Sequence, residues 1–197
     1  MNQKGRSMVE MLGVLAIIGV LSAGGLAGYS KAMFQYKLNK QRDQYTQILR
    51  GIIEYKSLIK EIPGAARRLE AYKKLNIIPP EMIKDESQYI YDIFGYKIQF
   101  YNSYWNIVFN EKGISSEKIC INIFQIFKEL PTDLGAVGVN STNSEDINQQ
   151  QWFFSDDSAS CRNGGGRCIR NMTIRDMHNM CSKCDSHSCG IYAIIKN

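Results

Sequence analysis

The residues of this chain best suited to chemistry are cysteines and histidines gathered near its C-terminus. Cys181, Cys184 and Cys189 lie close together in the segment CSKCDSHSC, with His178 and His187 beside them. Thiolates and imidazoles are common ligands of a tetrahedral zinc ion, and C-x-x-C is a ligand spacing. The same pair could also be a redox-active dithiol. A zinc ribbon would need a second close pair, however, and a thioredoxin-like motif would need a surrounding βαβ pattern that this sequence lacks.

Structural disulfides are the third possibility for the cysteines, and the rest of the chain favours them. The chain has six cysteines, and five of them follow Ser160. An even number of cysteines beside a membrane span is typical of a domain in an oxidising compartment. Many pairings are possible, and the spacing of the cysteines alone does not choose among them.

Catalytic motifs are missing from the sequence, which therefore predicts no enzyme activity, no cofactor and no metal site. No G-x-S-x-G, H-E-x-x-H or P-loop motif occurs. The glycine-rich turn over residues 163–166 lacks the strand, helix and lysine that a phosphate-binding loop requires. The acidic residues Glu145, Asp146, Asp156 and Asp157 are interpreted as solvated loop charges.

Charge patterning argues against a nucleic-acid partner. The chain has 197 residues and a formal net charge of +5, with small basic groups over residues 37–42 and 67–74. Solvated or membrane-proximal helix faces explain such scattered groups better than nucleic-acid binding does. Once one membrane span is set aside, enough chain remains for one globular domain with its own core.

The strongest pattern in the sequence is an apolar stretch near the N-terminus. Residues 11–28 carry no charge, and at about 1.5 Å per helical residue they cross most of a bilayer core. Glu10 immediately precedes this run, and a carboxylate at the membrane edge needs a partner because its burial is costly. A cleaved secretory signal has a shorter apolar run, so a retained signal anchor is predicted.

The residues around Glu10 resemble the prepilin signal of type IV pilins and type II secretion pseudopilins. In that family a short basic leader ends in Gly, an inner-membrane peptidase cuts after it, and Glu is the fifth residue of the mature chain. Here the leader would be MNQKG, cut between Gly5 and Arg6, which makes Glu10 the fifth residue. The segment LAIIGVLSAGG is similar to the apolar stem of the family.

This resemblance implies a filament subunit whose N-terminal helices bundle with copies of themselves. Cleavage would expose an ammonium group at Arg6, and Glu10 of one subunit would pair with the ammonium of a neighbour. Small residues would let the helices approach closely, and Gly24 and Gly28 have the GxxxG spacing. The glycines concerned are Gly13, Gly19, Gly24, Gly25 and Gly28. An alternative role for them is to make the helix pliable.

Helical periodicity continues beyond the apolar stretch and predicts one helix from about Arg6 to Leu58. Its first half is apolar on all sides, and its second half is amphipathic. The apolar stripe of the second half is formed by Phe34, Leu38, Tyr45, Leu49, Ile52 and Ile59. Coiled-coil dimerisation is the alternative role for that stripe. Pro63 and Gly64 end the helix.

The remaining residues predict alternating helices and strands. Strand patterns occur over residues 89–93, 95–101 and 104–110, the last two as an antiparallel hairpin, and shorter ones over 136–139 and 152–154. Helices are expected over residues 65–75, 117–130 and 173–181. Ser115 or Ser116 would cap the second of these, with Cys120 in its first turn. Residues 190–196 form the last strand, expected to be central in the sheet.

The predicted fold class is therefore α+β. In the terms of the resemblance it is a pilin fold, in which a long N-terminal helix packs on an antiparallel sheet of a head with disulfides. The domains are a leader (residues 1–5), a transmembrane and filament-core helix (6–28), an amphipathic helix half (29–60) and a globular head (61–197).

The resemblance is closest to the type IVb branch, and it implies a disulfide pairing. Type IVb pilins join the helix after the hairpin to the segment before the last strand, which implies a Cys120–Cys181 bridge. Cys161–Cys168 and Cys184–Cys189 would then remain as local bridges.

The family's assembly route supplies the expected partners. The precursor would lie in the inner membrane with its head in the periplasm, be cut by prepilin peptidase, and be extracted by an assembly platform and its ATPase. It would then form an extracellular helical homopolymer, a type IV pilus. Alternatives are a minor pilin, a type II secretion pseudopilin or, outside the family, a signal-anchored periplasmic binding or redox protein.

Overall fold

The structure is a computed structural model that describes residues 8–84, 89–100, 104–109, 114–131, 133–141, 151–163, 167–182 and 189–196. It divides into two compact units, Met1–Asn39 and Lys40–Asn197, and each is described by itself. The fold is α+β, as predicted, with a long N-terminal helix, an antiparallel sheet and two disulfides.

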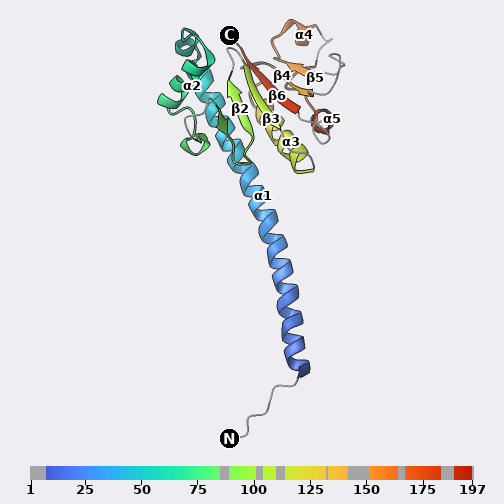
Figure 1. The fold of residues 1–197 in the computed structure, drawn as a ribbon. Coiled ribbons are helices and arrows are strands. Elements are labelled where there is room, and N and C mark those ends of the chain that lie inside the picture. Colours follow the sequence, from blue (N-terminus) through green and yellow to red (C-terminus); the bar gives the residue numbers. More distant parts are fainter. Residues whose placement is uncertain are drawn as a thin grey trace. The chain divides into compact units, whose positions relative to one another are not determined.

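Helix α1 (Met8–Lys60) is the longest element and belongs to both units (Figure 1). In the first unit its large apolar side chains are exposed, as at Leu15, Ile18 and Leu21. In the second unit one face of α1 is buried, and it consists of Gln41, Gln44, Tyr45, Ile48, Leu49, Ile52 and Ile59. The sequence predicted this difference between an apolar first half and an amphipathic second half of the helix.

The described residues form one antiparallel sheet in the order β1-β2-β3-β6-β4-β5. Its strands are β1 (Ile90–Tyr91), β2 (Lys97–Phe100), β3 (Tyr104–Phe109), β4 (Leu134–Ser141), β5 (Gln151–Phe154) and β6 (Cys189–Ile195). The C-terminal strand β6 pairs with both β3 and β4, so its predicted central position is confirmed (Figure 1).

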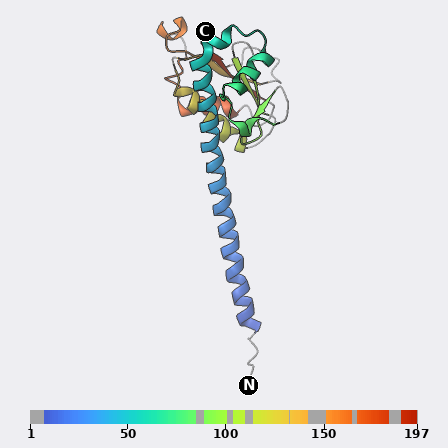
Figure 2. The same ribbon diagram turned by 90° about the vertical axis from the view of Figure 1, so that its left-hand side faces the viewer.

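Within the described part of the chain, the helical segments beside the sheet are α2 (Ala65–Lys74), the 3-10 helix η1 (Pro80–Met82), α3 (Ile114–Lys128), α4 (Ala159–Arg162) and α5 (Ile174–Cys181). Figure 2 shows α2 beside the C-terminal end of α1. The core contains fully buried residues of α1, of the sheet and of α3, including Tyr45, Ile98, Phe124 and Phe127. The rings of Phe124 and Phe127 pack edge to face, with their centroids 5.8 Å apart.

Two predicted boundaries are wrong. Helix α3 begins at Ile114, so Ser115 and Ser116 lie within the helix and Cys120 lies beyond its first turn. Serine is tolerated in a first helical turn, so a capping residue type alone does not define where a helix starts. The strand predicted over residues 89–93 is shorter because Asp92 begins a turn, which the Gly95 N–H closes by donating to the Asp92 carbonyl.

Candidate functional site

The exposed half of α1 is the first candidate site. Glu10 lies in its first turn, and the apolar stretch that follows is long enough to cross a membrane. None of the most apolar 18-residue window of this helix is buried within the described structure. This half of α1 can therefore serve as a membrane anchor. Gly5 and Arg6, the predicted cleavage site, lie outside the described residues.

The glycines of this half have open space beside them. A Cβ atom placed on Gly13, Gly19, Gly24, Gly25 or Gly28 would meet no other atom within 4 Å, apart from neighbouring residues and the local helix backbone. At about 100° per residue, Glu10, Gly13, Gly24 and Gly28 lie within about 60° of one another on the helix surface. Gly19 lies on the other side. The helix thus brings the carboxylate and three of these five glycines, Gly13, Gly24 and Gly28, onto one face.

The second candidate site is the long-range disulfide Cys120–Cys181, which joins α3 to α5. Its Cα atoms are 5.7 Å apart, its half-cystines are separated by 61 residues, and both are buried. This is the pairing that the resemblance implied. Because the bridge closes a long loop, it restricts the unfolded chain strongly.

Polar contacts also join α3 to α5 and to the residues just before α5. His178 on α5 contacts the Glu117 carboxylate on α3, and Lys128 Nζ donates a 2.8 Å hydrogen bond to the Met172 carbonyl. Helix α5 begins with a capping box, in which the Asp176 N–H donates to Thr173 Oγ1 and the Thr173 N–H donates to the Asp176 carboxylate. The hydrogen bonds from Thr173 lower the pKa of Asp176.

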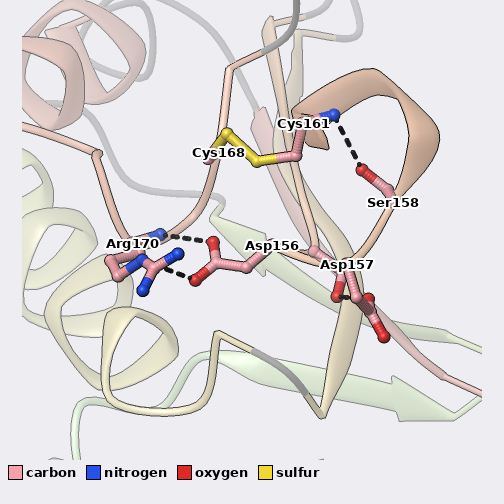
Figure 3. Close-up of a disulfide and its surroundings, with 7 residues drawn as sticks. Asp156, Asp157, Ser158, Cys161, Cys168 and Arg170 are labelled. Carbon is pink, nitrogen blue, oxygen red and sulfur yellow. Dashed lines mark hydrogen bonds and ion pairs between the residues drawn. A yellow bond between two sulfur atoms is a disulfide. The ribbon is translucent and has the colours of Figure 1, made fainter. Parts of the chain in front are cut away.

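The second disulfide, Cys161–Cys168, closes the short loop that follows α4 (Figure 3). Ser158 caps α4 by accepting a 3.2 Å hydrogen bond from the Cys161 N–H. On the other side of the loop, the backbone of Cys168 forms a parallel bridge with Phe154 at the end of β5. The resemblance implied this pairing too. The third pairing that it implied, Cys184–Cys189, cannot be compared, because Cys184 lies outside the described residues.

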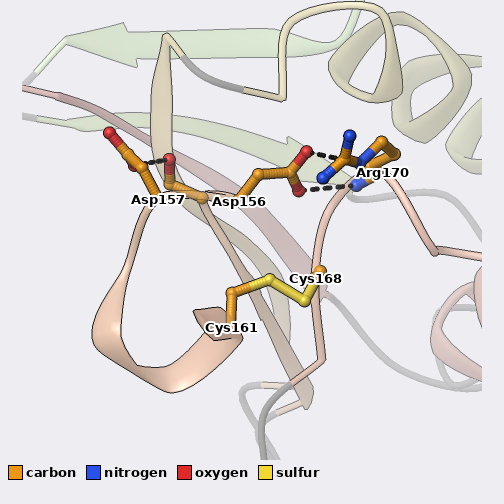
Figure 4. A network of polar contacts seen from close by, with 6 residues as sticks. Asp156, Asp157, Cys161, Cys168 and Arg170 are labelled. Atoms are coloured by element: carbon orange, nitrogen blue, oxygen red, sulfur yellow. Dashed lines mark hydrogen bonds and ion pairs between the residues drawn. A yellow bond between two sulfur atoms is a disulfide. The ribbon is translucent and has the colours of Figure 1, made fainter. Parts of the chain in front are cut away.

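Asp156 anchors the base of the same loop (Figure 4). Its carboxylate accepts hydrogen bonds from Arg170 Nε at 2.9 Å and from the Arg170 N–H at 3.3 Å. The Asp156 side chain is only 9% exposed, so its interpretation as a solvated loop charge is wrong. Asp157, which is more exposed, contacts Lys196 near the C-terminus.

These bridges bear on the alternative chemistry of the C-terminal cysteines. A zinc site or a dithiol at the C-x-x-C pair needs the Cys181 thiolate, but here its sulfur is bonded to Cys120. Among the residues described, no group of three or more His, Cys, Asp or Glu side chains is arranged to hold a metal ion. Cys184 and His187 lie outside them.

A third site, which the sequence did not predict, is a buried polar group that we call the Asp92 cluster. It consists of Gln41, Gln44 and Tyr45 on α1, Asp92 after β1, and Asn122 on α3, all of them buried. Asp92 Oδ2 accepts hydrogen bonds from Gln41 Nε2 at 2.7 Å and from the Tyr45 hydroxyl at 2.9 Å. Asn122 Nδ2 donates to Gln41 Oε1 at 2.9 Å.

The other carboxylate oxygen of Asp92 holds its own turn. Asp92 Oδ1 accepts from the backbone N–H groups of Phe94 and Tyr96, each at 2.9 Å, and the Ile93 N–H donates to Gln44 Oε1 at 3.1 Å. The turn also needs Gly95, whose φ of 86° lies in the region that glycine adopts readily. The Asp92 cluster thus joins a turn of the sheet to α1 and to α3.

Burial is the main cause of the pKa shifts of Asp92 and Tyr45 in this cluster. Loss of hydration raises the pKa of Asp92 above its ordinary value, although the hydrogen bonds from Gln41, Tyr45 and the turn backbone act in the opposite direction. The pKa of Tyr45 is raised well above its ordinary value, first by burial and then by the neighbouring Asp92 carboxylate.

One sequence signal could have indicated the cluster. Gln41 and Gln44 occupy the same helix face as Tyr45 and Ile48, so two amides interrupt an apolar stripe. Amides on a buried face need hydrogen-bond partners. Their partner Asp92 follows about fifty residues later, and nothing local to α1 indicates it.

No family model matches the chain, and no curated protein and no solved structure matches it either. Its class is therefore defined by its own fold: an α+β protein with a long, exposed, apolar N-terminal helix and a disulfide-bonded antiparallel-sheet domain. This combination is compatible with a pilin fold.

Proposed function

We propose that the chain is the precursor of a type IV pilin, a structural subunit that polymerises through its N-terminal helix. The observation that carries the proposal is the division of α1. Its first half presents an apolar surface with Glu10 at its start, and its second half is buried on one face. An apolar surface of this size needs to be covered by lipid or by other helices.

Processing follows from the spacing of Gly5, Arg6 and Glu10. Prepilin peptidase would hydrolyse the Gly5–Arg6 bond and leave a free ammonium group on Arg6. In the inner membrane and later in the filament core, the Glu10 carboxylate of one subunit would pair with this ammonium of a neighbour. Pairing offsets the cost of holding each charge in an apolar environment, and it sets the axial spacing of subunits.

The role proposed for the rest of the chain is structural. The assembly platform and its ATPase would extract the processed subunit from the inner membrane, and the heads would cover the outside of the filament. Such heads would be exposed outside the cell, where disulfides persist. The bridges Cys120–Cys181 and Cys161–Cys168 fit that setting.

Two alternatives within the same family fit the same observations. A minor pilin or a type II secretion pseudopilin would share the processing and the helix but would not be the main component of surface fibres. A signal-anchored periplasmic redox protein is disfavoured by the bond between Cys181 and Cys120, which removes one thiol of the C-x-x-C pair.

The decisive experiment expresses the chain with and without prepilin peptidase and measures its intact mass. We expect a mature chain that begins at Arg6 only when the peptidase is present, and a Gly5→Glu variant that keeps its leader. Cryo-microscopy of sheared surface fibres should then show α1 in the core. A chain that keeps residues 1–5 in the presence of the peptidase, and never enters a fibre, would refute the proposal.

A further inference from the structure

We infer that the Asp92 cluster is a register device: it fixes the axial and rotational position of the second half of α1 on the head. This role goes beyond filament assembly, because it concerns how the single subunit is built. It follows from three features of the interface, namely its apolar residues, its hydrogen bonds and its surface ion pairs.

The aliphatic contacts of α1 do not define one register by themselves. Ile48, Leu49 and Ile52 are similar in size and recur at helical spacing on the buried face. A slide of one turn, about 5.4 Å, would place Leu49 where Tyr45 lies and Ile52 where Ile48 lies. Apolar burial is non-directional, and cores tolerate exchanges between side chains of similar volume, so the aliphatic contacts discriminate weakly between registers. The larger ring of Tyr45 and the close approach of Gly51 to Ile77 act in the same direction as the cluster.

The hydrogen bonds of the cluster discriminate strongly. They have donor–acceptor distances of 2.7–3.1 Å and join α1 to Asp92, to the Ile93 N–H and to Asn122. After the same slide, Tyr45 and Leu49 would lie where Gln41 and Tyr45 now bind the Asp92 carboxylate, and Ile48 would face the Ile93 N–H in place of Gln44. A buried charge and a buried donor would then lose partners, which is far more costly than a change of apolar partner.

The head side of the cluster is held in place independently of α1. Asp92 is oriented by the backbone N–H groups of Phe94 and Tyr96, and Asn122 is carried by α3. The polar groups that α1 must meet therefore have fixed positions before the helix docks. Buried polar groups that specify register at the expense of stability are known from other helical interfaces.

Ion pairs around the interface contribute less to register. Lys40 Nζ lies 2.6 Å from Glu81 Oε1, and Arg42 contacts Glu129, but all four side chains are about a third exposed or more. Long, solvated side chains can follow a sliding helix and contribute little. The Lys40–Glu81 pair is nevertheless a useful reporter, because its two atoms are close enough for a zero-length cross-link.

The register has a consequence that rests on the proposed function. If the stem helices form a filament core, the rotational position of the head on its own helix decides which head surfaces meet between neighbouring subunits. The cluster would then determine filament geometry from inside the subunit. The test below uses detergent-solubilised monomers, so its outcome does not depend on whether the chain polymerises.

The test is carbodiimide cross-linking of the full chain in mild detergent, followed by peptide mapping. In the wild type we expect one cross-link from Glu81 to α1, at Lys40. In the variant Gln41→Leu/Tyr45→Phe/Asp92→Asn, which keeps side-chain volumes similar, we expect the yield of this product to fall, because a slide of one turn would bring Gln44 or Tyr36 beside Glu81 in place of Lys40. The matched control Ile52→Ala loses apolar packing but keeps the cluster, and it should keep the single product.

A triple variant that is folded, with both disulfides formed, and still gives the Lys40–Glu81 product in wild-type yield would overturn the inference. If the triple variant does not fold, the single variants Gln41→Met and Tyr45→Phe decide. Each removes one bond to Asp92 while the turn keeps its own hydrogen bonds. We expect each to lower the yield of the Lys40–Glu81 product, and a wild-type yield in both would equally refute the register role.

Discussion

The Asp92 carboxylate, on the turn after β1, accepts a 2.7 Å hydrogen bond from Gln41 Nε2 on the stem helix α1, and both side chains are buried. This bond connects residues 51 positions apart in the chain. Because a charged group is involved, it makes the docking of α1 on the head sensitive to the protonation of one carboxyl.

The pH dependence of stability should identify that carboxyl. The native pKa of Asp92 is raised, so the folded protein binds this proton more tightly than the unfolded chain. The resulting stability is fully present below the ordinary value of 3.8 and is lost as pH rises through the native pKa. The difference in unfolding free energy between wild type and Asp92→Asn should therefore fall with rising pH, by at most about 1.4 kcal/mol per pH unit.

Urea unfolding in mild detergent across the acid range would measure this difference. Asp176→Asn supplies a control of opposite sign, since the native pKa of Asp176 is lowered by its capping hydrogen bonds. Its contribution is present above the ordinary value of 3.8 and is lost as pH falls through the native pKa. A difference for Asp92→Asn that rises with pH would contradict the account.

The two disulfides should differ in their contributions to stability. In the loop-entropy model, the Cys120–Cys181 bridge, with a separation of 61 residues, contributes about 4 kcal/mol, and Cys161–Cys168, with a separation of 7, contributes about 2.5 kcal/mol. The double variant Cys120→Ala/Cys181→Ala should thus have the lower unfolding free energy. Equal losses for both double variants would argue that the long bridge does not restrict the unfolded chain as expected.

Gly51 should be required for the docking of the segment after α2. A Cβ atom at this position would lie 2.7 Å from Ile77 Cγ2, so Gly51→Ala should destabilise the protein by about 1–3 kcal/mol. Helix propensity alone would predict the opposite effect, because it favours Ala over Gly by about 1 kcal/mol. Ile77→Ala in the same chain should remove the clash. A double-mutant cycle without favourable coupling would show that the contact is not the cause.

Glu10 should be needed for assembly and not for folding. Glu10→Val should leave an exported, folded precursor but remove the partner of the neighbouring ammonium, a loss of about 3–5 kcal/mol per contact if the pair is buried. The amount of sheared surface fibre measures the effect. Glu54→Val, the same change at an exposed site of α1, is the control and should assemble normally. Wild-type fibre yields from Glu10→Val would argue against the pairing.

The face that carries Glu10 should also be the face of close helix contact. Gly24→Leu and Gly28→Leu place bulk on this face, whereas Gly19→Leu places it on the other side of the helix. Fibre yields should therefore fall more for the first two variants than for the third. Equal losses from all three would indicate that the glycines act through helix flexibility instead.

Local sequence patterns were sufficient to predict the helices and strands but not the contacts between them. Hydrophobic periodicity predicted α1, the hairpin of β2 and β3 and helix α5, because each depends on residues a few positions apart. The pairing Cys120–Cys181 came from a family resemblance, because spacing does not choose among the many pairings of six cysteines. Helix α4 and the turn at Asp92 were missed, since short elements carry weak periodic signals.

The sequence by itself determined that residues 11–28 form an uncharged stretch of a long helix and that an α+β head follows, because composition and periodicity act over short distances. Only the tertiary structure decided that Gln41 and Gln44 meet Asp92, that Gly51 faces Ile77 and that Asp156 holds Arg170. Each of these contacts needs residues brought together from separate elements, and their energies depend on burial and direction, which no local pattern encodes.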